Sequence, residues 1–159
     1  MIRLGRQEDL DQLYLLARRV VKNLRENRID QWTDGYPDRD DFEKDIMSNA
    51  LFIVEYEGVL VGSITVLPEN EEFYHEVTWD SDDAYVVHRV MVSPDYHRQG
   101  IGTALFEHAI AYAKSNNKKA LKVDTHPDNY RMQSLIQSLG FKYCGYIRSI
   151  NRQGYELLL

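Results

Sequence analysis

The residues with the clearest chemical meaning form a short loop, His97-Arg98-Gln99-Gly100-Ile101-Gly102. An apolar, strand-like run ends just before this loop, and an amphipathic helix is predicted to begin at Gly100. The first N–H groups of a helix have no acceptor inside the helix, and they lie at the positive end of its dipole. Glycine lets a bound group approach such a backbone closely. The loop therefore predicts a binding site for an anion such as phosphate.

Two side chains of the preceding strand are candidates for a general base. His88 lies two residues before Val90 and shares its face if the strand is regular. An imidazole, with an ordinary pKa of about 6.5, suits proton transfer at neutral pH. Asp83, where the strand begins, is the second candidate. For each of the two, a structural or solvent-facing role is the alternative.

Composition restricts the class of protein. With 159 residues and 43% hydrophobic content, the chain suits one domain, residues 1–159, with a proper core. The formal net charge of -6 argues against nucleic acid as a partner and favours a cationic small molecule or peptide. No apolar run approaches the ~20 residues that cross a bilayer, so we expect a cytoplasmic protein that does not associate with membranes. One cysteine, Cys144, and no metal-ligand spacing lead us to expect neither an internal disulfide nor a metal.

Hydrophobic periodicity and turn residues predict the elements that must position these groups. Strands are predicted at residues 2–4, 51–56, 59–67, 84–92, 120–124, 141–149 and 154–158, and helices at residues 10–24, 40–49, 100–114 and 129–139. The dipeptide Glu57-Gly58 predicts a hairpin, whereas the strand–helix–strand unit over residues 84–124 indicates parallel pairing. Residues 68–83 are predicted to form a long polar loop. The fold class is therefore α+β, a three-layer α/β arrangement with a mixed sheet and helices packed on both faces.

Two segments of the sequence carry a resemblance to a known family. The first is the loop at residues 97–102, and the second runs from Asn129 through a helix to Leu139-Gly140-Phe141. Together with the order of the elements, they resemble the GNAT superfamily of acetyl-CoA-dependent N-acetyltransferases over nearly the whole chain. The family loop reads Arg/Gln-x-x-Gly-x-Gly/Ala, so His97 departs from its first position, and Arg98 and Gln99 supply similar donors nearby.

The resemblance implies a single GNAT-like domain that uses acetyl-CoA as its co-substrate. It implies a sheet splayed between the strands at residues 86–92 and 121–124, where pantetheine pairs with the backbone of Val90 and Val92. The Val92 N–H would polarise the acetyl carbonyl. Asn129 would contact the cofactor arm or cap the last helix, and both roles are compatible. The implied cofactor-binding residues are Val90, Met91, Val92, His97, Arg98, Gln99, Gly100, Ile101, Gly102, Thr103, Asn129 and Met132.

The general acid expected from the resemblance is absent. Many family members have a tyrosine four residues before the glycine of Leu-Gly-Phe, and this chain has Ile136 there. Tyr130 and Tyr143 lie nearby in sequence but are not direct substitutes, and Cys144 is expected to be a small core residue. The chain is therefore expected to be an N-acetyltransferase that acts by direct attack. The alternatives are a noncatalytic acyl-CoA-binding sensor or partner module, and an acyltransferase for O-linked or longer acyl groups.

The resemblance places the acceptor site at the first helix region and at the loop before the long strand, residues 27–38 and 68–83. Both segments combine aromatic residues with carboxylates, which suits the ammonium group of a primary amine. We therefore expect a cationic small-molecule or peptide acceptor. The alternative is that the aromatic rings pack beneath the loops and that the acids are solvated. Family members often form homodimers, so a homodimer is a further expectation.

Overall fold

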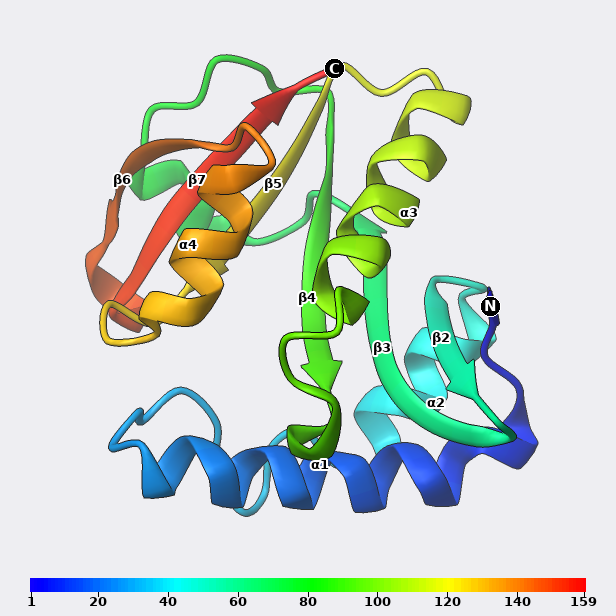
Figure 1. The fold of residues 1–159 in the computed structure, drawn as a ribbon. Helices are drawn as coiled ribbons and strands as arrows, with labels where there is room; N and C mark the ends of the chain where they lie inside the picture. The colour runs from blue at the N-terminus through cyan, green and yellow to red at the C-terminus, as the bar shows by residue number, and fades with distance from the viewer. The chain divides into compact units, whose positions relative to one another are not determined.

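The computed structural model describes all of residues 1–159 as an α+β fold with a mixed seven-stranded sheet in the order β1-β2-β3-β4-β5-β7-β6 (Figure 1). The strands are β1 (Ile2–Leu4), β2 (Leu51–Tyr56), β3 (Val59–Pro68), β4 (Ala84–Val92), β5 (Ala120–Thr125), β6 (Lys142–Ile147) and β7 (Arg152–Leu158), and the helices are α1 (Leu10–Glu26), α2 (Arg39–Met47), α3 (Ile101–Ser115) and α4 (Tyr130–Ser138). Every predicted element is present, with its ends within two residues of the prediction. The predicted fold class is confirmed.

Contacts between residues gather into two compact units. The first unit comprises Met1–Thr65 and Arg89–Phe106, and the second comprises Val66–His88 and Glu107–Leu159. The strands β3 and β4 and the helix α3 each contribute residues to both units.

The first unit contains an antiparallel arrangement of β1, β2 and β3. Glu57 and Gly58 join β2 to β3, and both have left-handed backbone conformations, with φ of 51° and 79°. Two successive left-handed residues match the twist of the flanking strands, so the predicted hairpin is confirmed.

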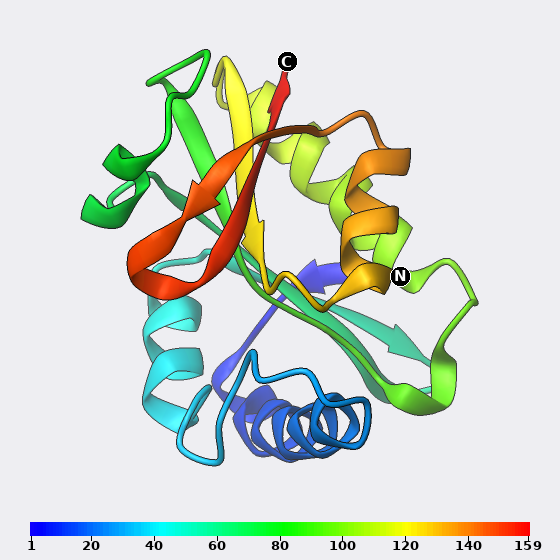
Figure 2. The same cartoon turned by 90° about the vertical axis from the view of Figure 1, so that its left-hand side faces the viewer.

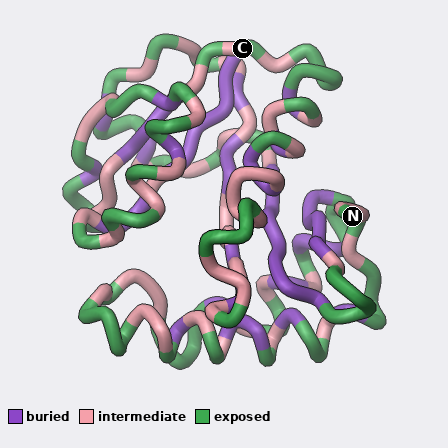
Figure 3. The backbone as a smooth tube through the Cα atoms, viewed as in Figure 1, coloured by how far each residue is buried: buried purple, intermediate pink, exposed green.

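The core of the first unit forms where one face of α1 and of α2 meets the strands. Leu13, Leu16 and Ala17 of α1 are buried, while Leu10 and Val20 are half-buried at the edges of the same stripe. The other buried members are Phe42, Ile46, Leu51, Ile53, Leu60 and Met91. Figure 3 shows that burial is nearly continuous along β3 and alternates along α1.

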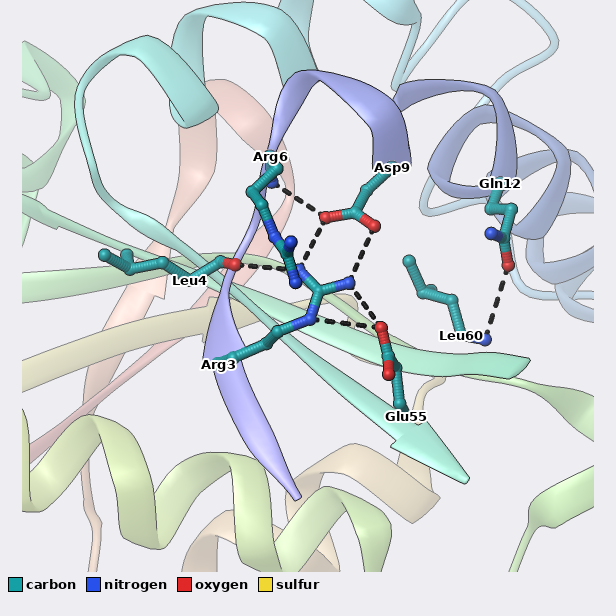
Figure 4. A network of polar contacts seen from close by, with 7 residues as sticks. All are labelled: Arg3, Leu4, Arg6, Asp9, Gln12, Glu55 and Leu60. Atoms are coloured by element: carbon teal, nitrogen blue, oxygen red, sulfur yellow. Dashed lines mark hydrogen bonds and ion pairs between the residues drawn. The ribbon is translucent and has the colours of Figure 1, made fainter. Parts of the chain in front are cut away.

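A charged network joins β1 to the start of α1 (Figure 4). The Arg3 guanidinium donates to both carboxylate oxygens of Asp9, at 2.8 and 2.9 Å, and to Glu55 on β2. Asp9 also accepts the backbone N–H of Arg6 at 2.8 Å. Hydrogen bonds from Arg3 and from the Arg6 backbone outweigh burial, so the pKa of the Asp9 carboxyl is below its ordinary value.

Replacing Asp9 with asparagine should lower the free energy of unfolding by about 1–3 kcal/mol at pH 7, because the half-buried Arg3 loses the counter-charge of the buried Asp9. The carboxyl binds a proton more readily in the unfolded chain, so the difference between wild type and variant should shrink as the pH falls below about 4. Urea denaturation across pH 2–7 measures both effects. Asp11→Asn, which removes an exposed partner of Arg39, is the control and should change stability by less than about 0.5 kcal/mol.

The second unit is built on β5, β7 and β6, which pair antiparallel in that order; Figure 2 shows the red and orange hairpin of β7 and β6 beside the yellow β5. The segment expected to be a polar loop, residues 68–83, contains a 3-10 turn over Glu72–Glu76 and no strand apart from the end of β3. Its aromatic side chains pack into a core cluster of this unit. The cluster comprises Tyr74, Val77, Val86 and Ile147, with Phe73, Trp79, Cys144 and Ile150 packed against it.

Candidate functional site

The loop before α3 has the geometry of an anion site. Arg98 and Gly100 are left-handed, with φ of 64° and 78°. The first hydrogen bond that enters α3 runs from the Ala104 N–H to the Gly100 carbonyl, at 3.0 Å. The N–H groups of Ile101, Gly102 and Thr103 therefore precede the helical ladder. Because the loop from Arg98 to Gly100 is exposed, a phosphate can reach these donors without rearrangement of the core.

Close packing of two strands fixes where this loop begins. The Ser93 N–H donates to the Val61 carbonyl at 2.7 Å, and the Tyr96 N–H donates to the Ser93 carbonyl at 2.9 Å. Gly62 permits this approach, since a Cβ there would lie 2.9 Å from the Met91 carbonyl oxygen. The end of β4 and the start of the loop are thus held directly against β3.

The strand β4 is irregular at its middle, which overturns one prediction. Arg89 is left-handed, with φ of 49°, and this conformation breaks the alternation of side chains along the strand. The prediction that His88 and Val90 share one face assumed a regular strand. That assumption was wrong, because Arg89 between them is left-handed. Parallel pairing of β4 with β5 covers residues 84–86 and 120–122, whereas β5 stays paired with β7 as far as Thr125. Pairing that ends at Val86 agrees with the predicted splay.

In the second unit, His88 has an acidic partner that sequence reasoning did not single out. Nε2 of His88 lies 3.0 Å from Oε1 of Glu71, with the side chains 17% and 18% exposed. The imidazole N–H direction is poorly aligned with the carboxylate, so the contact is mainly electrostatic. Burial raises the pKa of Glu71, but His88 and the Asn70 N–H lower it by more, so the pKa of this carboxyl is below its ordinary value. A carboxylate at Nε2 favours the proton on that nitrogen and leaves Nδ1 as the basic one.

A second half-buried acid, Asp124, lies close enough to His88 for their charges to interact. The Tyr74 hydroxyl donates to Oδ2 of Asp124 on β5 at 2.6 Å. Burial raises the pKa of Asp124, while Tyr74, His88 and Arg152 oppose that rise. Burial, with Asp124 beside it, also raises the pKa of Tyr74 well above its ordinary value. Tyr74 therefore remains protonated, and its hydroxyl donates its hydrogen bond to Asp124.

The second predicted base, Asp83, has a structural partner. Its carboxylate lies 3.3 Å from Nζ of Lys118, and its carbonyl accepts the N–H groups of Lys119 and Ala120. Asp83 thus anchors the start of β5 beside β4. These contacts favour a structural role for Asp83, whose carboxylate has Lys118 as its charged partner.

Several acidic and aromatic side chains of residues 68–83 make contacts with other residues of the second unit. Trp79 stacks on Tyr74 with ring centroids 5.0 Å apart, and Lys122 lies over the Trp79 ring at 4.7 Å. Glu69 pairs with the buried Lys122, and Glu76 accepts the Ser149 N–H at 3.1 Å. For residues 68–83 the alternative therefore holds for two rings: Tyr74 is buried in the core cluster, and Trp79 is half-buried against it.

The helix α4 confirms one of the two roles considered for Asn129. Its side chain caps the helix by accepting the Met132 N–H at 3.1 Å. Ile136, at the position of the family tyrosine, is fully buried, while Tyr130 is 70% exposed. Cys144 is half-buried, and burial together with the neighbouring Glu156 raises the pKa of its thiol, as expected for an unreactive cysteine.

Comparison with known proteins identifies the family. The model of the Acetyltransferase (GNAT) family matches residues 18–141. This chain therefore belongs to the GNAT family of acetyltransferases, and acetyl-CoA is the donor that this family uses. A GNAT-family acetyltransferase from Streptococcus agalactiae has a similar structure, with a TM-score of 0.89 and 26% identity, over 100% of this chain and 95% of that one.

Two curated relatives are similar over parts of the chain. A probable N-acetyltransferase, camello, from Xenopus tropicalis is 30% identical over 64% of this chain and 44% of its own length. The [ribosomal protein bS18]-alanine N-acetyltransferase of Escherichia coli K12 is 36% identical over 37% of this chain and 40% of its own length. The chain spans between 29% and 46% of the first three curated relatives that it matches. No helix of the structure combines the length and apolar character needed to cross a membrane.

Proposed function

We propose that this chain is an acetyl-CoA-dependent N-acetyltransferase in which residues 1–159 act as one catalytic domain. The observation that carries the proposal is the loop before α3, with left-handed Arg98 and Gly100 and with three N–H groups ahead of the first helical hydrogen bond. Membership of the GNAT family supports coenzyme A as the group that this loop holds.

The donors of the loop suit a pyrophosphate. The proposed donors are the N–H groups from Arg98 to Thr103, with the Thr103 hydroxyl and His97 at the edges. Each hydrogen bond to a charged oxygen contributes about 1.5–3 kcal/mol, and the α3 dipole adds about 0.3–1 kcal/mol. The backbone of Val90, Met91 and Val92 is proposed to pair with pantetheine, and Asn129 and Met132 to contact the cofactor arm.

In the proposed reaction, acetyl-CoA supplies an acetyl group on a thioester. A neutral amine forms a new N–C bond with the acetyl carbon, the C–S bond breaks, and the coenzyme leaves as its thiolate. The Val92 N–H stabilises the negative charge that develops on the carbonyl oxygen. Nδ1 of His88 takes the proton from the amine, directly or through one water, and the charge of Glu71 favours the tautomer that leaves Nδ1 without a proton. Asp83 remains the second candidate base.

The proposed acceptor is a cationic compound with a primary amine. The net charge of -6 favours positively charged acceptors, and the bS18-alanine N-acetyltransferase relative makes a peptide amine a reasonable test compound. Thiol release should be measured with spermidine, an aminoglycoside, a peptide with N-terminal alanine, and matched neutral and anionic amines. Turnover of a cationic amine is the expected result. Preference for the neutral or anionic compounds would contradict the cationic acceptor.

A second candidate function is a noncatalytic module that binds acyl-CoA. The fully buried Ile136 favours it, because the usual phenol of the family is missing at that position. Tight binding of coenzyme A by calorimetry, without thiol release for any amine in the panel, would select this function over the first.

A further inference from the structure

Arg89 has an unusual position for an arginine. It lies in the middle of β4, between His88 and Val90, with a left-handed φ of 49°. Residues other than glycine, asparagine and aspartate rarely adopt this conformation, because it is strained for most side chains that carry a Cβ. Contacts of the Arg89 side chain must therefore offset the strain of its backbone.

The guanidinium of Arg89 is locked by a buried carboxylate from α2. Nε and Nη2 of Arg89 donate to the two oxygens of Asp45, at 2.6 and 2.7 Å. The side chains are 13% and 4% exposed, and the Thr65 hydroxyl donates to the same carboxylate at 2.9 Å. This two-point contact fixes the plane of the guanidinium, which a lysine ammonium would not do.

The remaining arm of the guanidinium reaches a loop. Nη1 of Arg89 donates to the Tyr36 hydroxyl at 3.0 Å. Arg18 of α1 holds the same loop from another direction, since it donates to the carbonyls of Thr33, Asp34 and Pro37. Tyr36 itself is 38% exposed, so its ring is presented at the surface while its hydroxyl is tied to β4.

From these contacts we propose that Arg89 is a positioning residue for the acceptor. Its guanidinium ties Tyr36, and with it residues 33–37 of the segment expected to bind the acceptor, to α2 and to the part of β4 that lies in the first unit. The inference rests on the proposed function, since β4 carries the transfer there. In this proposal Arg89 does not touch the reacting atoms; it fixes the conformation of residues 33–37, which belong to the segment expected to bind the acceptor.

The guanidinium can be tested separately from the backbone conformation. Asparagine tolerates a left-handed φ, so Arg89→Asn keeps the break in β4 and removes the tie. The chain has two tryptophans, and Trp32 meets the Tyr36 ring edge-on with centroids 6.4 Å apart. Fluorine NMR of 5-fluorotryptophan-labelled protein gives one resonance for each, with Trp32→Phe providing the assignment. The Trp79 resonance is the internal reference.

Arg89→Asn should shift or broaden the Trp32 resonance, leave that of Trp79 in place, and lower kcat/KM for the most active amine of the panel about 10- to 100-fold. The dissociation constant of coenzyme A should change less than threefold. Tyr36→Phe, a mild change at a partly exposed residue, should lower kcat/KM about 3- to 10-fold. Arg25→Asn, which removes a surface pair with Asp34 in the same loop, is the matched control and should match wild type.

The inference is overturned if Arg89→Asn leaves the position and linewidth of the Trp32 resonance unchanged and kcat/KM within twofold of wild type. If that variant does not fold, unchanged values for Tyr36→Phe overturn it equally. Wild-type protein that acetylates no amine would instead contradict the proposed function, while the Trp32 resonance would still report whether Arg89 holds the loop.

Discussion

Replacing Gly100 with valine should weaken coenzyme A binding at least about 30-fold. Gly100 has φ of 78°, and a Cβ there would meet no atom within 4 Å, so the cost lies in the backbone conformation and not in a clash. A β-branched residue rarely adopts this conformation, and the loop must change shape to accept it. Loss of one or two hydrogen bonds to charged oxygens corresponds to about 2–4 kcal/mol. Isothermal titration calorimetry with coenzyme A measures the change.

Gly58 offers a closely matched control for this experiment. It has φ of 79° and equally open surroundings, but it lies in the hairpin between β2 and β3. Gly58→Val should therefore cost similar stability and leave coenzyme A binding within about twofold of wild type. Equal losses of affinity in the two variants would mean that strain alone explains the result, and unchanged affinity in Gly100→Val would remove the loop from the binding site.

Substituting His88 with alanine should lower kcat about 100-fold or more and flatten the acidic limb of the pH–rate profile. The physical reason is the loss of the group that accepts the proton of the amine. Coenzyme A affinity should stay within about threefold, since none of the proposed donors to the pyrophosphate is changed. Steady-state rates of thiol release between pH 5 and pH 9, with the most active amine, measure the effect.

Two further variants separate catalysis from general damage. His75 is exposed in the 3-10 turn Glu72–Glu76, and His75→Ala should behave as wild type. Glu71→Gln keeps the shape of the partner side chain but removes its charge, and it should lower kcat about 10-fold because the ring loses its preferred tautomer. An acidic limb that survives in His88→Ala would exclude His88 as the base and direct attention to Asp83.

Local sequence signals predicted the elements well because their causes are local. The α1 stripe follows from apolar residues three and four positions apart, and the turn at Glu57-Gly58 follows from left-handed conformations that glycine readily adopts. The same holds for the loop at residues 97–102, where Gly100 is left-handed as the loop requires. Asn129 was also correctly predicted as a cap.

Side-chain environments were predicted less well because they depend on distant partners. The sequence left open whether the aromatic rings of residues 68–83 face an acceptor or pack beneath the loop; Tyr74 is buried, and the half-buried Trp79 stacks on it. Nothing in the alternation of β4 signalled that Arg89 would be left-handed, since arginine has no preference for that conformation. One such residue was enough to invalidate the assumption that His88 and Val90 share a face.

The sequence by itself determined the class of protein, the order of the elements and the glycine loop that is proposed to bind a pyrophosphate, because glycine positions and hydrophobic periods act over a few neighbouring residues. Only the tertiary structure decided which charged groups meet. Arg89 finds Asp45 across 44 positions, and Tyr74 finds Asp124 across 50. Pairings over such separations are selected by the packing of whole elements and by the high cost of leaving a buried charge without a partner.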